Sequence, residues 1–205
     1  MEMSIVCFGD SLTEGYQSSS GFSGEGFTPY GRFLQERLGE QGTVWIRGVC
    51  GETTQNMKQR FPRDVLALGP HYVVILGGTN DLGCELSPAS VVENLAWLYA
   101  QAQSHEILPV GVTIPSLGGL ASGGSGVSPY AEAIQARKVV NQALMAHCNI
   151  KQIPLVDLFT ATCDPQSQEL ASQYSEDGLH LTTAGYRTLS DLLWYQVFQS
   201  ALQNQ

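Results

Sequence analysis

The stretch Ile5-Val6-Cys7-Phe8-Gly9-Asp10-Ser11-Leu12-Thr13-Glu14-Gly15-Tyr16 decides how the chain is organised. Its apolar start breaks at Gly9, and Ser11 follows one residue past Asp10. This pattern predicts a buried strand whose carboxyl end delivers a hydroxyl into a turn before a helix. Ligands of open parallel sheets bind just outside the carboxyl ends of the strands. Ser11 is therefore a candidate nucleophile, provided that the chain brings a base to it.

Strand-like apolar runs alternate with helical patterns along the whole chain. Strands are predicted at 5–8, 43–46, 71–76, 107–112 and 153–157, and helices at 29–41, 54–68, 87–104, 128–147 and 183–203. Pro62 predicts a kink or a break in the second helix. The alternation predicts an α/β fold with five parallel strands covered on both faces, and right-handed crossovers favour the flavodoxin-like strand order 2-1-3-4-5. We expect a single domain over residues 1–205.

Composition narrows the class of partner. A net charge of −9 argues against nucleic acid and against anionic lipid surfaces, and it suits a neutral or cationic small substrate. No apolar run is long enough to span a bilayer, and the N-terminus carries no basic and apolar leader. Five scattered cysteines without a CxxC pair favour a reduced compartment, so we expect a cytoplasmic protein. A periplasmic or secreted protein whose signal peptide is missing from this sequence remains the alternative.

Polar residues of catalytic type follow several of the predicted strands. Ser11 follows the first strand, Gly51 the second and Asn80 the third, while Asp177 and His180 come after the fifth. The carboxyl ends of parallel strands lie on one edge of the sheet, so these segments are expected to meet at one crevice. The convergence of these segments is stronger evidence for a functional site than any one motif.

The chemistry of acyl transfer requires each of these residue types. A serine hydroxyl needs an adjacent base, which His180 can supply, and a carboxylate such as Asp177 can fix the imidazole tautomer. Attack on a carbonyl creates an oxyanion that needs preset donors. The candidates are the backbone N–H groups of Ser11 and Gly51 and the side-chain amide of Asn80.

Four motifs occur in order: Gly9-Asp10-Ser11-Leu12, Gly48-Val49-Cys50-Gly51-Glu52-Thr53, Gly78-Thr79-Asn80-Asp81 and Asp177-Gly178-Leu179-His180. With them the chain resembles the GDSL-type esterases and lipases of the SGNH hydrolase superfamily over nearly its whole length. The resemblance implies a three-layer α/β/α fold, Ser11 as nucleophile, His180 as base, Asp177 as orienting acid, and an oxyanion hole that includes Gly51 and Asn80. It also implies hydrolysis of esters or thioesters without a metal or other cofactor. Two positions depart from the common pattern: Glu52 replaces a frequent aspartate, and Leu181 a frequent proline.

Each candidate also has a plainer interpretation. Ser11 can be a helix N-cap, Gly51 can serve a tight turn, and Asn80 or Asp81 can cap the helix after the third strand. Asp10 is expected to be a structural turn or capping carboxylate. Asp157, at the end of the fifth strand, is a rival for the acid role that ranks behind Asp177. No chemistry is assigned to three other histidines: His71, His105 and His147.

The substrate contacts are expected in two Gly/Ser-rich loops, 17–31 and 114–127. Their larger side chains are candidates for an acyl pocket: Phe22, Phe27, Tyr30, Leu117 and Leu120. The sequence thus predicts a serine hydrolase that cleaves small to medium acyl esters of small molecules. A thioesterase, a lysophospholipase and a carbohydrate O-deacetylase would use the same residues. A binding domain that has kept the fold without turnover is the alternative from another class.

Overall fold

The computed structural model describes residues 2–18, 26–118 and 130–203 of the 205-residue chain. Its five strands pair in parallel in the order β2-β1-β3-β4-β5, which confirms the predicted sheet. The strands are β1 (Met3–Gly9), β2 (Gly42–Gly48), β3 (Tyr72–Leu76), β4 (Leu108–Val112) and β5 (Leu155–Val156).

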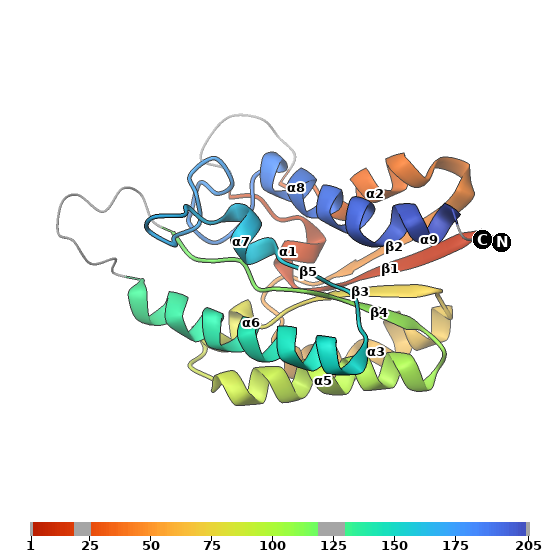
Figure 1. Ribbon diagram of the computed structural model, residues 1–205, viewed down its shortest axis with the longest axis horizontal. Coiled ribbons are helices and arrows are strands. Elements are labelled where there is room, and N and C mark those ends of the chain that lie inside the picture. The colour runs from red at the N-terminus through yellow and green to blue at the C-terminus, as the bar shows by residue number, and fades with distance from the viewer. Residues whose placement is uncertain (1, 19–25, 119–129, 204–205) are drawn as a thin grey trace.

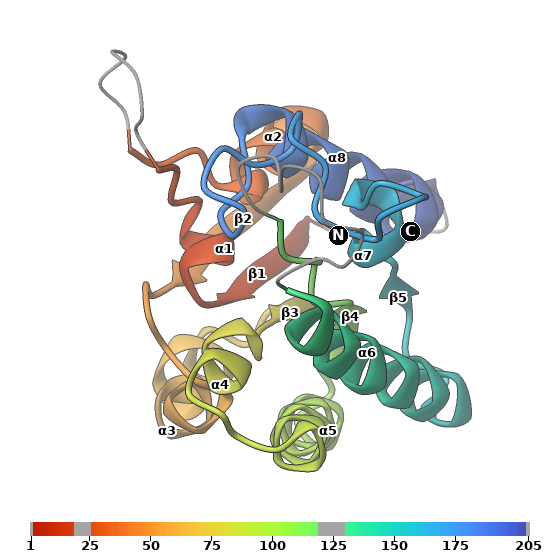
Figure 2. The same ribbon diagram turned by 90° about the vertical axis from the view of Figure 1, so that its left-hand side faces the viewer.

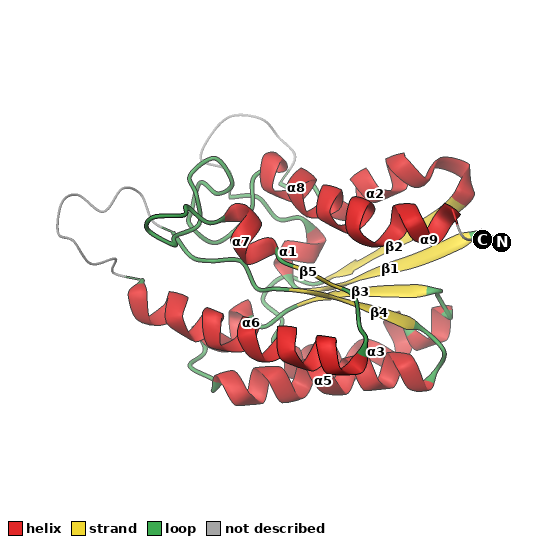
Figure 3. Cartoon of the chain, in the orientation of Figure 1, coloured by secondary structure: helices red, strands yellow, loops and turns green. Residues whose placement is uncertain are grey.

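Helices cover both faces of the sheet, so that the sheet and two layers of helices make three layers (Figure 1). One layer holds α2 (Tyr30–Leu38), α8 (Thr183–Leu193) and α9 (Gln199–Gln203), and the other holds α3 (Thr54–Asp64), α5 (Pro88–Ser104) and α6 (Ala131–Lys151). Figure 3 shows the two helical layers in red on either side of the yellow strands. Three short helices lie near the carboxyl ends of the strands, at the edge that faces the viewer in Figure 2: α1 (Ser11–Glu14), α4 (Thr79–Gly83) and α7 (Leu158–Thr162).

The alternation of side chains along β1 explains why both faces of the sheet are covered. Met3, Ile5 and Cys7 belong to the apolar cluster on the side of α2 and α8, whereas Val6 and Phe8 belong to the cluster on the side of α3 and α5. All five side chains have no exposed surface. Burial of a strand on both faces is typical of a parallel sheet between helical layers.

Several elements differ in extent or form from the predictions. The strand predicted at 153–157 pairs only over Leu155–Val156, and the helix predicted at 128–147 continues to Lys151. The helix predicted at 54–68 breaks near Pro62, as expected, because α3 ends at Asp64, two residues after the proline. The helix predicted at 183–203 contains a π-helical segment, η3 (Trp194–Phe198). Short 3₁₀ turns follow α2 and α3, namely η1 (Gly39–Gln41) and η2 (Leu66–Leu68).

Gly9 fixes how closely the end of β1 can approach its neighbours. A Cβ atom at this position would lie 2.1 Å from the Leu76 carbonyl oxygen and 2.3 Å from Thr13 Oγ1. Only glycine fits there. Because it has no side chain, the chain can turn directly from β1 into α1. In the described part of the chain, no helix is both long and apolar enough to cross a bilayer.

Candidate active site

Ser11 is the first residue of α1, and Asp10 is the N-cap of that helix. The Asp10 Oδ1 atom accepts a hydrogen bond of 2.9 Å from the Leu12 N–H. The capping role expected for Asp10 is confirmed, and it leaves the Ser11 hydroxyl free of a capping task. Ser11 is buried, with only 4% of its surface exposed.

Asp177 and His180 form a compact pair in the turn that precedes α8. The carboxylate atom Oδ2 lies 2.7 Å from the imidazole Nδ1, and Oδ1 accepts the backbone N–H groups of Leu179 and His180 at 2.9 and 2.7 Å. Partial burial would raise the pKa of Asp177, but the hydrogen bonds from His180 and Leu179 outweigh it, and the pKa lies below its ordinary value. Asp177 is therefore ionised at neutral pH and can hold a proton on Nδ1.

Ser175 stabilises this turn through its hydroxyl group. Its hydroxyl donates to the His180 carbonyl oxygen at 2.7 Å and accepts from the Gly178 N–H at 2.9 Å. The side chain is buried, and so the turn that carries both Asp177 and His180 is fixed at two points. Sequence reasoning missed Ser175, although a serine two residues before the acid of a tight turn is a signal that could have found it.

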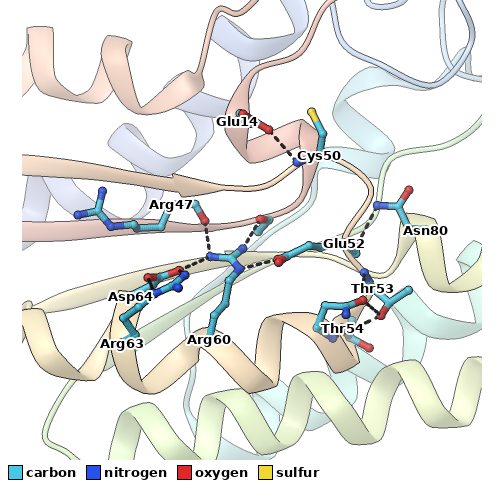
Figure 4. A network of polar contacts seen from close by, with 12 residues as sticks. Glu14, Arg47, Cys50, Glu52, Thr53, Thr54, Arg60, Arg63, Asp64 and Asn80 are labelled. Carbon is cyan, nitrogen blue, oxygen red and sulfur yellow. Dashed lines mark hydrogen bonds and ion pairs between the residues drawn. The ribbon is translucent and has the colours of Figure 1, made fainter.

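The turn Val49–Glu52 presents the Gly51 N–H at the end of β2. Gly51 has a φ of +77°, and the Glu52 N–H lies 3.4 Å from the Val49 carbonyl oxygen. A positive φ at the third position of a β-turn favours glycine. The Cys50 N–H donates to Glu14 Oε2 at 2.7 Å, which ties this turn to α1 (Figure 4).

Asn80 lies in α4, after the end of β3, and faces the same turn. Its Nδ2 donates to the Glu52 carbonyl oxygen at 2.9 Å, as Figure 4 shows. An amide nitrogen carries two N–H groups, so one remains for a ligand. Among the described residues, no acceptor is bonded to the backbone N–H of Ser11 or of Gly51. Three donors from three strand ends are thus available at one edge of the sheet.

A cleft of about 310 Å³ brings the candidates together. It is lined by Ser11, Tyr16, Cys50, Gly51, Asn80, Leu179 and His180. In the structure, the Ser11 hydroxyl and the His180 ring make no direct hydrogen bond although they share this cleft. Because Asp177 occupies Nδ1, Nε2 is the nitrogen that remains for a reacting group. Such contacts are often long in unliganded enzymes and tighten with substrate.

Tyr16 lines the cleft beside His180. Its ring lies 4.6 Å from the His180 ring at an interplanar angle of 66°, and the ring of Phe27 lies 5.8 Å from it. Tyr186 donates a hydrogen bond of 2.6 Å to the Tyr16 carbonyl oxygen, so the backbone here is anchored to α8. Tyr16 was not predicted as a site residue. Phe27 was predicted as a pocket residue. Its ring contacts that of Tyr16, and 44% of its surface is exposed.

A second cleft, of about 290 Å³, shares His180 with the first. Polar side chains dominate it, and its lining is Gln17, Ser18, Gln173, Glu176, His180, Leu181, Thr182, Thr183 and Ala184. Gln17 Nε2 donates to Thr183 Oγ1 at 2.9 Å, which joins the segment after α1 to the start of α8.

Two of the other predicted pocket residues, Tyr30 and Leu117, do not line the first cleft. Tyr30 is fully buried in the core on the side of α2, so it cannot contact substrate in this structure. Leu117 is partly buried, and its carbonyl oxygen accepts the Leu170 N–H at 2.8 Å. Phe22 and Leu120 lie outside the described residues.

Three other acids and histidines weighed in the sequence have structural partners. Asp157 caps α7 and accepts from Thr113 Oγ1 at 2.9 Å, and it lines a separate cleft. His71 bonds Ser4 near the amino end of β1. Asp81, expected to cap α4, instead accepts from both the backbone N–H and the hydroxyl of Thr54, at 2.8 and 2.5 Å. Gly78 is the N-cap of α4 and Thr53 that of α3, so Asp81 caps neither helix and instead binds the first residue of α3.

Cys50 is the thiol of the cleft, and its environment keeps it protonated. Burial, with Glu14 nearby, raises the pKa of Cys50 to about 12. Since the thiolate is the reactive form of cysteine, Cys50 is a poor nucleophile at neutral pH. This leaves the Ser11 hydroxyl as the candidate nucleophile of the cleft.

Comparisons with known proteins concern the family and the fold of the chain. A model of the GDSL-like Lipase/Acylhydrolase family matches residues 7–188. The "Uncharacterized lipoprotein YqeF" of Bacillus subtilis strain 168 is 31% identical over 128 residues, which are 56% of this chain and 50% of that protein. The alignment thus spans about half the length of this curated relative.

Solved structures share the fold at low sequence identity. A GDSL-like lipase from Bacteroides thetaiotaomicron is 22% identical, with a TM-score of 0.73 over 99% of this chain and 89% of that chain. A lipase/acylhydrolase from Enterococcus faecalis is 23% identical, with a TM-score of 0.75 over 98% and 96%. A mutant of an acetyl-xylooligosaccharide esterase from Geobacillus is 17% identical, with a TM-score of 0.77 over 97% of each chain.

Proposed function

The chain belongs to the GDSL-like Lipase/Acylhydrolase family, and from this premise we propose that it is a serine esterase that forms an acyl-enzyme on Ser11. Membership of this family makes the chain a carboxylic ester hydrolase. The assignment of its catalytic residues is our proposal. One observation carries it. A single cleft holds Ser11, Gly51, Asn80 and His180, and Asp177 lies 2.7 Å behind the imidazole.

Acylation begins when Ser11 Oγ attacks the ester carbonyl carbon. Nε2 of His180 takes the hydroxyl proton, while Asp177 holds the proton on Nδ1 and stabilises the imidazolium that forms. The carbonyl oxygen becomes an oxyanion, which accepts hydrogen bonds from the N–H groups of Ser11 and Gly51 and from the Asn80 amide. The intermediate collapses as His180 passes the proton to the leaving alkoxide, and an alcohol departs.

Deacylation repeats these steps with water. His180 takes a proton from the water molecule, which attacks the carbonyl carbon of the acyl-Ser11 ester. The same three donors stabilise the second oxyanion, and return of the proton to Ser11 Oγ releases the carboxylic acid. The reaction therefore needs the imidazole in its neutral form at the start of each half.

Small to medium acyl groups suit the described part of the cleft. Its volume is about 310 Å³, and Tyr16 and Leu179 provide apolar surface beside the polar donors. A thioesterase or a lysophospholipase would use the same residues. A panel of p-nitrophenyl esters of increasing acyl length, with a matched acyl thioester and a lysophospholipid, separates these activities.

A carbohydrate O-deacetylase is the second candidate, and the polar cleft beside His180 favours it. During acylation His180 must protonate the leaving alcohol, so the alcohol lies on the side of the imidazole. The second cleft offers neutral amide and hydroxyl groups there, from Gln17, Gln173 and Thr183 among others. Such groups suit a polyhydroxylated alcohol, and one structural neighbour is an acetyl-xylooligosaccharide esterase. A higher kcat/KM for acetylated sugars than for aryl acetates of equal acyl size supports this candidate.

Substitution of the nucleophile tests the main proposal. Ser11→Ala is expected to lower kcat on p-nitrophenyl acetate on the order of 10⁴-fold or more, while the fold survives. Intact-mass and peptide analysis after treatment with a fluorophosphonate should find one adduct, on Ser11. Ser90→Ala, at the exposed start of α5, is the matched control and should keep full activity. Full turnover by Ser11→Ala would overturn the proposal, and the absence of any adduct would favour a binding domain.

We also propose a ligand and a cellular compartment for the protein. We assign a small ester as the ligand and a reduced compartment as the location, since none of the five cysteines forms a disulfide in the structure. The relative named as a lipoprotein favours a location outside the cytoplasm instead. Fractionation of the source cells with markers for each compartment decides between the two.

A further inference from the structure

Arg60 is a buried cation of α3, and it touches several segments that build the cleft. Its side chain is only 7% exposed. The Nε atom donates to Glu52 Oε2 at 2.5 Å, and Nη2 donates to the Gly9 carbonyl oxygen at 2.7 Å. The Nη1 atom donates to the Arg47 carbonyl oxygen and to Asp64 Oδ2, each at 3.0 Å. Figure 4 shows the guanidinium at the centre of these contacts.

These contacts join the carboxyl ends of two strands to the turn that follows β2. Gly9 ends β1, and Arg47 is next to the last residue of β2. The Gly9 carbonyl oxygen also accepts the Val49 N–H at 3.0 Å, so Arg60 and the turn share this one acceptor of β1. The guanidinium packs over the ring of Phe8 with 4.2 Å between Cζ and the ring centroid. A planar cation with a fixed fork of donors suits such a junction, which lysine could not reproduce.

Glu52 carries the connection from Arg60 to the oxyanion donors. Its carboxylate is bound by Arg60, and its carbonyl oxygen accepts the Asn80 side-chain amide at 2.9 Å. Gly51, whose backbone N–H is another of the donors, directly precedes Glu52. The orientation of Glu52 therefore affects both the Gly51 N–H and the free N–H of Asn80.

A second contact binds the same turn to α4. Thr54 begins α3, and its N–H and hydroxyl both donate to the carboxylate of Asp81, the residue after Asn80. The backbone at 52–54 is thus held to α4 at two places, and Arg60 holds it to the sheet. Buried polar groups with complete hydrogen bonding make a rigid arrangement, whereas partial loss frees it.

We propose that Arg60 and Glu52 are positioning residues that set the oxyanion hole. Arg60 fixes the Glu52 carboxylate, and the Glu52 backbone then orients the Asn80 amide and the Gly51 N–H toward the oxyanion. This inference rests on the proposed esterase function. Preset donors matter because reorientation during the reaction would cost part of their stabilisation.

The test separates an effect on the oxyanion hole from a loss of folded protein. Glu52→Gln keeps the side-chain length and the backbone but removes the charge that binds Arg60. Arg60→Lys keeps the positive charge but removes the fork. Active sites are titrated with a fluorophosphonate, and kcat per titrated site is measured on p-nitrophenyl acetate. Both variants are expected to lose about 10- to 100-fold in kcat per site with KM changed less than about threefold, since loss of one whole donor costs about 10²- to 10³-fold.

A double-mutant cycle shows which group is positioned. In an Asn80→Ala background, Glu52→Gln should lower kcat by a smaller factor than in the parent, because one of the two donors that it orients is already gone. Equal fold-losses in both backgrounds would overturn the link to Asn80. Unchanged kcat per titrated site in Glu52→Gln and Arg60→Lys would overturn the proposal and leave the pair a structural role only.

The control and the premise are tested in the same assays. Asp191→Asn breaks the ion pair of Arg37 with Asp191 between α2 and α8, remote from the turn, and should leave kcat per site unchanged. Retained turnover in Ser11→Ala would remove the proposed function. If Ser11 is required and Glu52→Gln has normal kcat per site, only the positioning role fails.

Discussion

Asp10 is fully buried one residue before Ser11, and only one of its two oxygens has a partner. Oδ1 accepts the Leu12 N–H, whereas Oδ2 has no hydrogen-bond partner among the described residues. Burial raises the pKa of Asp10 to about 7; the Leu12 N–H opposes the shift, and the charges of Asp81 and Glu52 add to it. The folded protein therefore keeps a proton on Asp10 at pH values where an unfolded chain has released it.

This shift predicts how stability depends on pH. An aspartate in the unfolded chain has a pKa of about 3.9, so between pH 4 and 7 the native state binds more protons than the unfolded state. The free energy of unfolding should then fall as the pH rises from about 4 to 7 and level off above it. Asp10→Asn removes the ionisation and keeps an oxygen for the Leu12 N–H. We expect this variant to exceed the parent in stability at pH 8 by on the order of 3 to 4 kcal/mol, and to match it near pH 4.

Urea unfolding of both proteins at several pH values measures this difference. Asp164→Asn, at an exposed turn where hydrogen bonds from Ser167 and Gln166 lower the pKa of the acid, is the control. It should leave the decline between pH 4 and 7 in place. A parent protein whose stability rises across that range, or an Asp10→Asn variant with the parent's pH profile, would show that Asp10 is ionised in the folded state.

Asp177 has a different task, and its substitution should separate catalysis from folding. In Asp177→Asn the retained oxygen can still accept the backbone N–H groups of Leu179 and His180, so the turn should survive. The new amide cannot hold a proton on Nδ1 as a carboxylate does, and the imidazole adopts the wrong tautomer. We expect kcat to fall on the order of 10⁴-fold with an unchanged circular dichroism spectrum.

Asp157→Asn is the matched comparison, because Asp157 also follows β5 but caps α7. It should cost some stability and little turnover. A larger loss of turnover in a folded Asp157→Asn variant than in Asp177→Asn would transfer the role of orienting acid to Asp157.

At the scale of elements, the sheet is predictable because its strands are apolar runs bounded by turn residues. Val73-Val74-Ile75-Leu76 must be buried on both faces, and such runs are typical of parallel strands. β5 is harder, since only Leu155–Val156 pair and the polar residues around them belong to turns. The π-helical segment Trp194–Phe198 has no signal in helical spacing, because its single extra residue per turn depends on packing against the core.

The site is predictable as far as strand ends define it. Ser11, Gly51 and Asn80 follow three neighbouring strands, so their meeting follows from topology alone. Arg60 could not be found in this way, because helical spacing does not reveal which strand ends a buried side chain of α3 will reach. Tyr30 shows the opposite error: an aromatic residue beside a glycine-rich loop was expected in a pocket and lies in the core.

The turn Val49–Glu52 gives a prediction at this scale. Gly51 has a φ of +77°, and a Cβ atom there would meet no other atom within 4 Å. Gly51→Ala therefore adds backbone strain without a steric clash, at a cost of about 1 to 2 kcal/mol. The turn can relieve this strain by rotating the peptide that carries the Gly51 N–H, so kcat on p-nitrophenyl acetate should fall about 10- to 100-fold.

Gly69→Ala provides the control for this strain. Gly69 follows η2 with a φ of +54°, and its Cβ atom would also meet nothing within 4 Å. Both variants should lose similar stability in thermal unfolding, and only Gly51→Ala should lose turnover. Equal turnover in the two variants would mean that the Gly51 N–H contributes nothing to the reaction.

At the scale of the whole molecule, net charge affects which esters reach the cleft. The chain carries a charge of −9, and several of its acids lie around the cleft. Glu14 binds the Cys50 N–H, Asp177 backs His180, and Glu176 lines the second cleft. A surface of one sign repels ligands of the same sign before any contact is made. Anionic esters should therefore be poorer substrates than neutral esters of equal size.

Salt dependence distinguishes this repulsion from a poor fit in the cleft. The screening length falls from about 30 Å at 0.01 M ionic strength to about 3 Å at 1 M. For p-nitrophenyl hemisuccinate, kcat/KM should rise about three- to tenfold across that range, mainly through KM, because screening removes a barrier to encounter. For p-nitrophenyl butyrate, a neutral ester of similar length, it should change less than about twofold. Equal salt responses of the two esters would show that the charge of the protein does not select its substrates, and the contacts inside the cleft would then have to account for any preference.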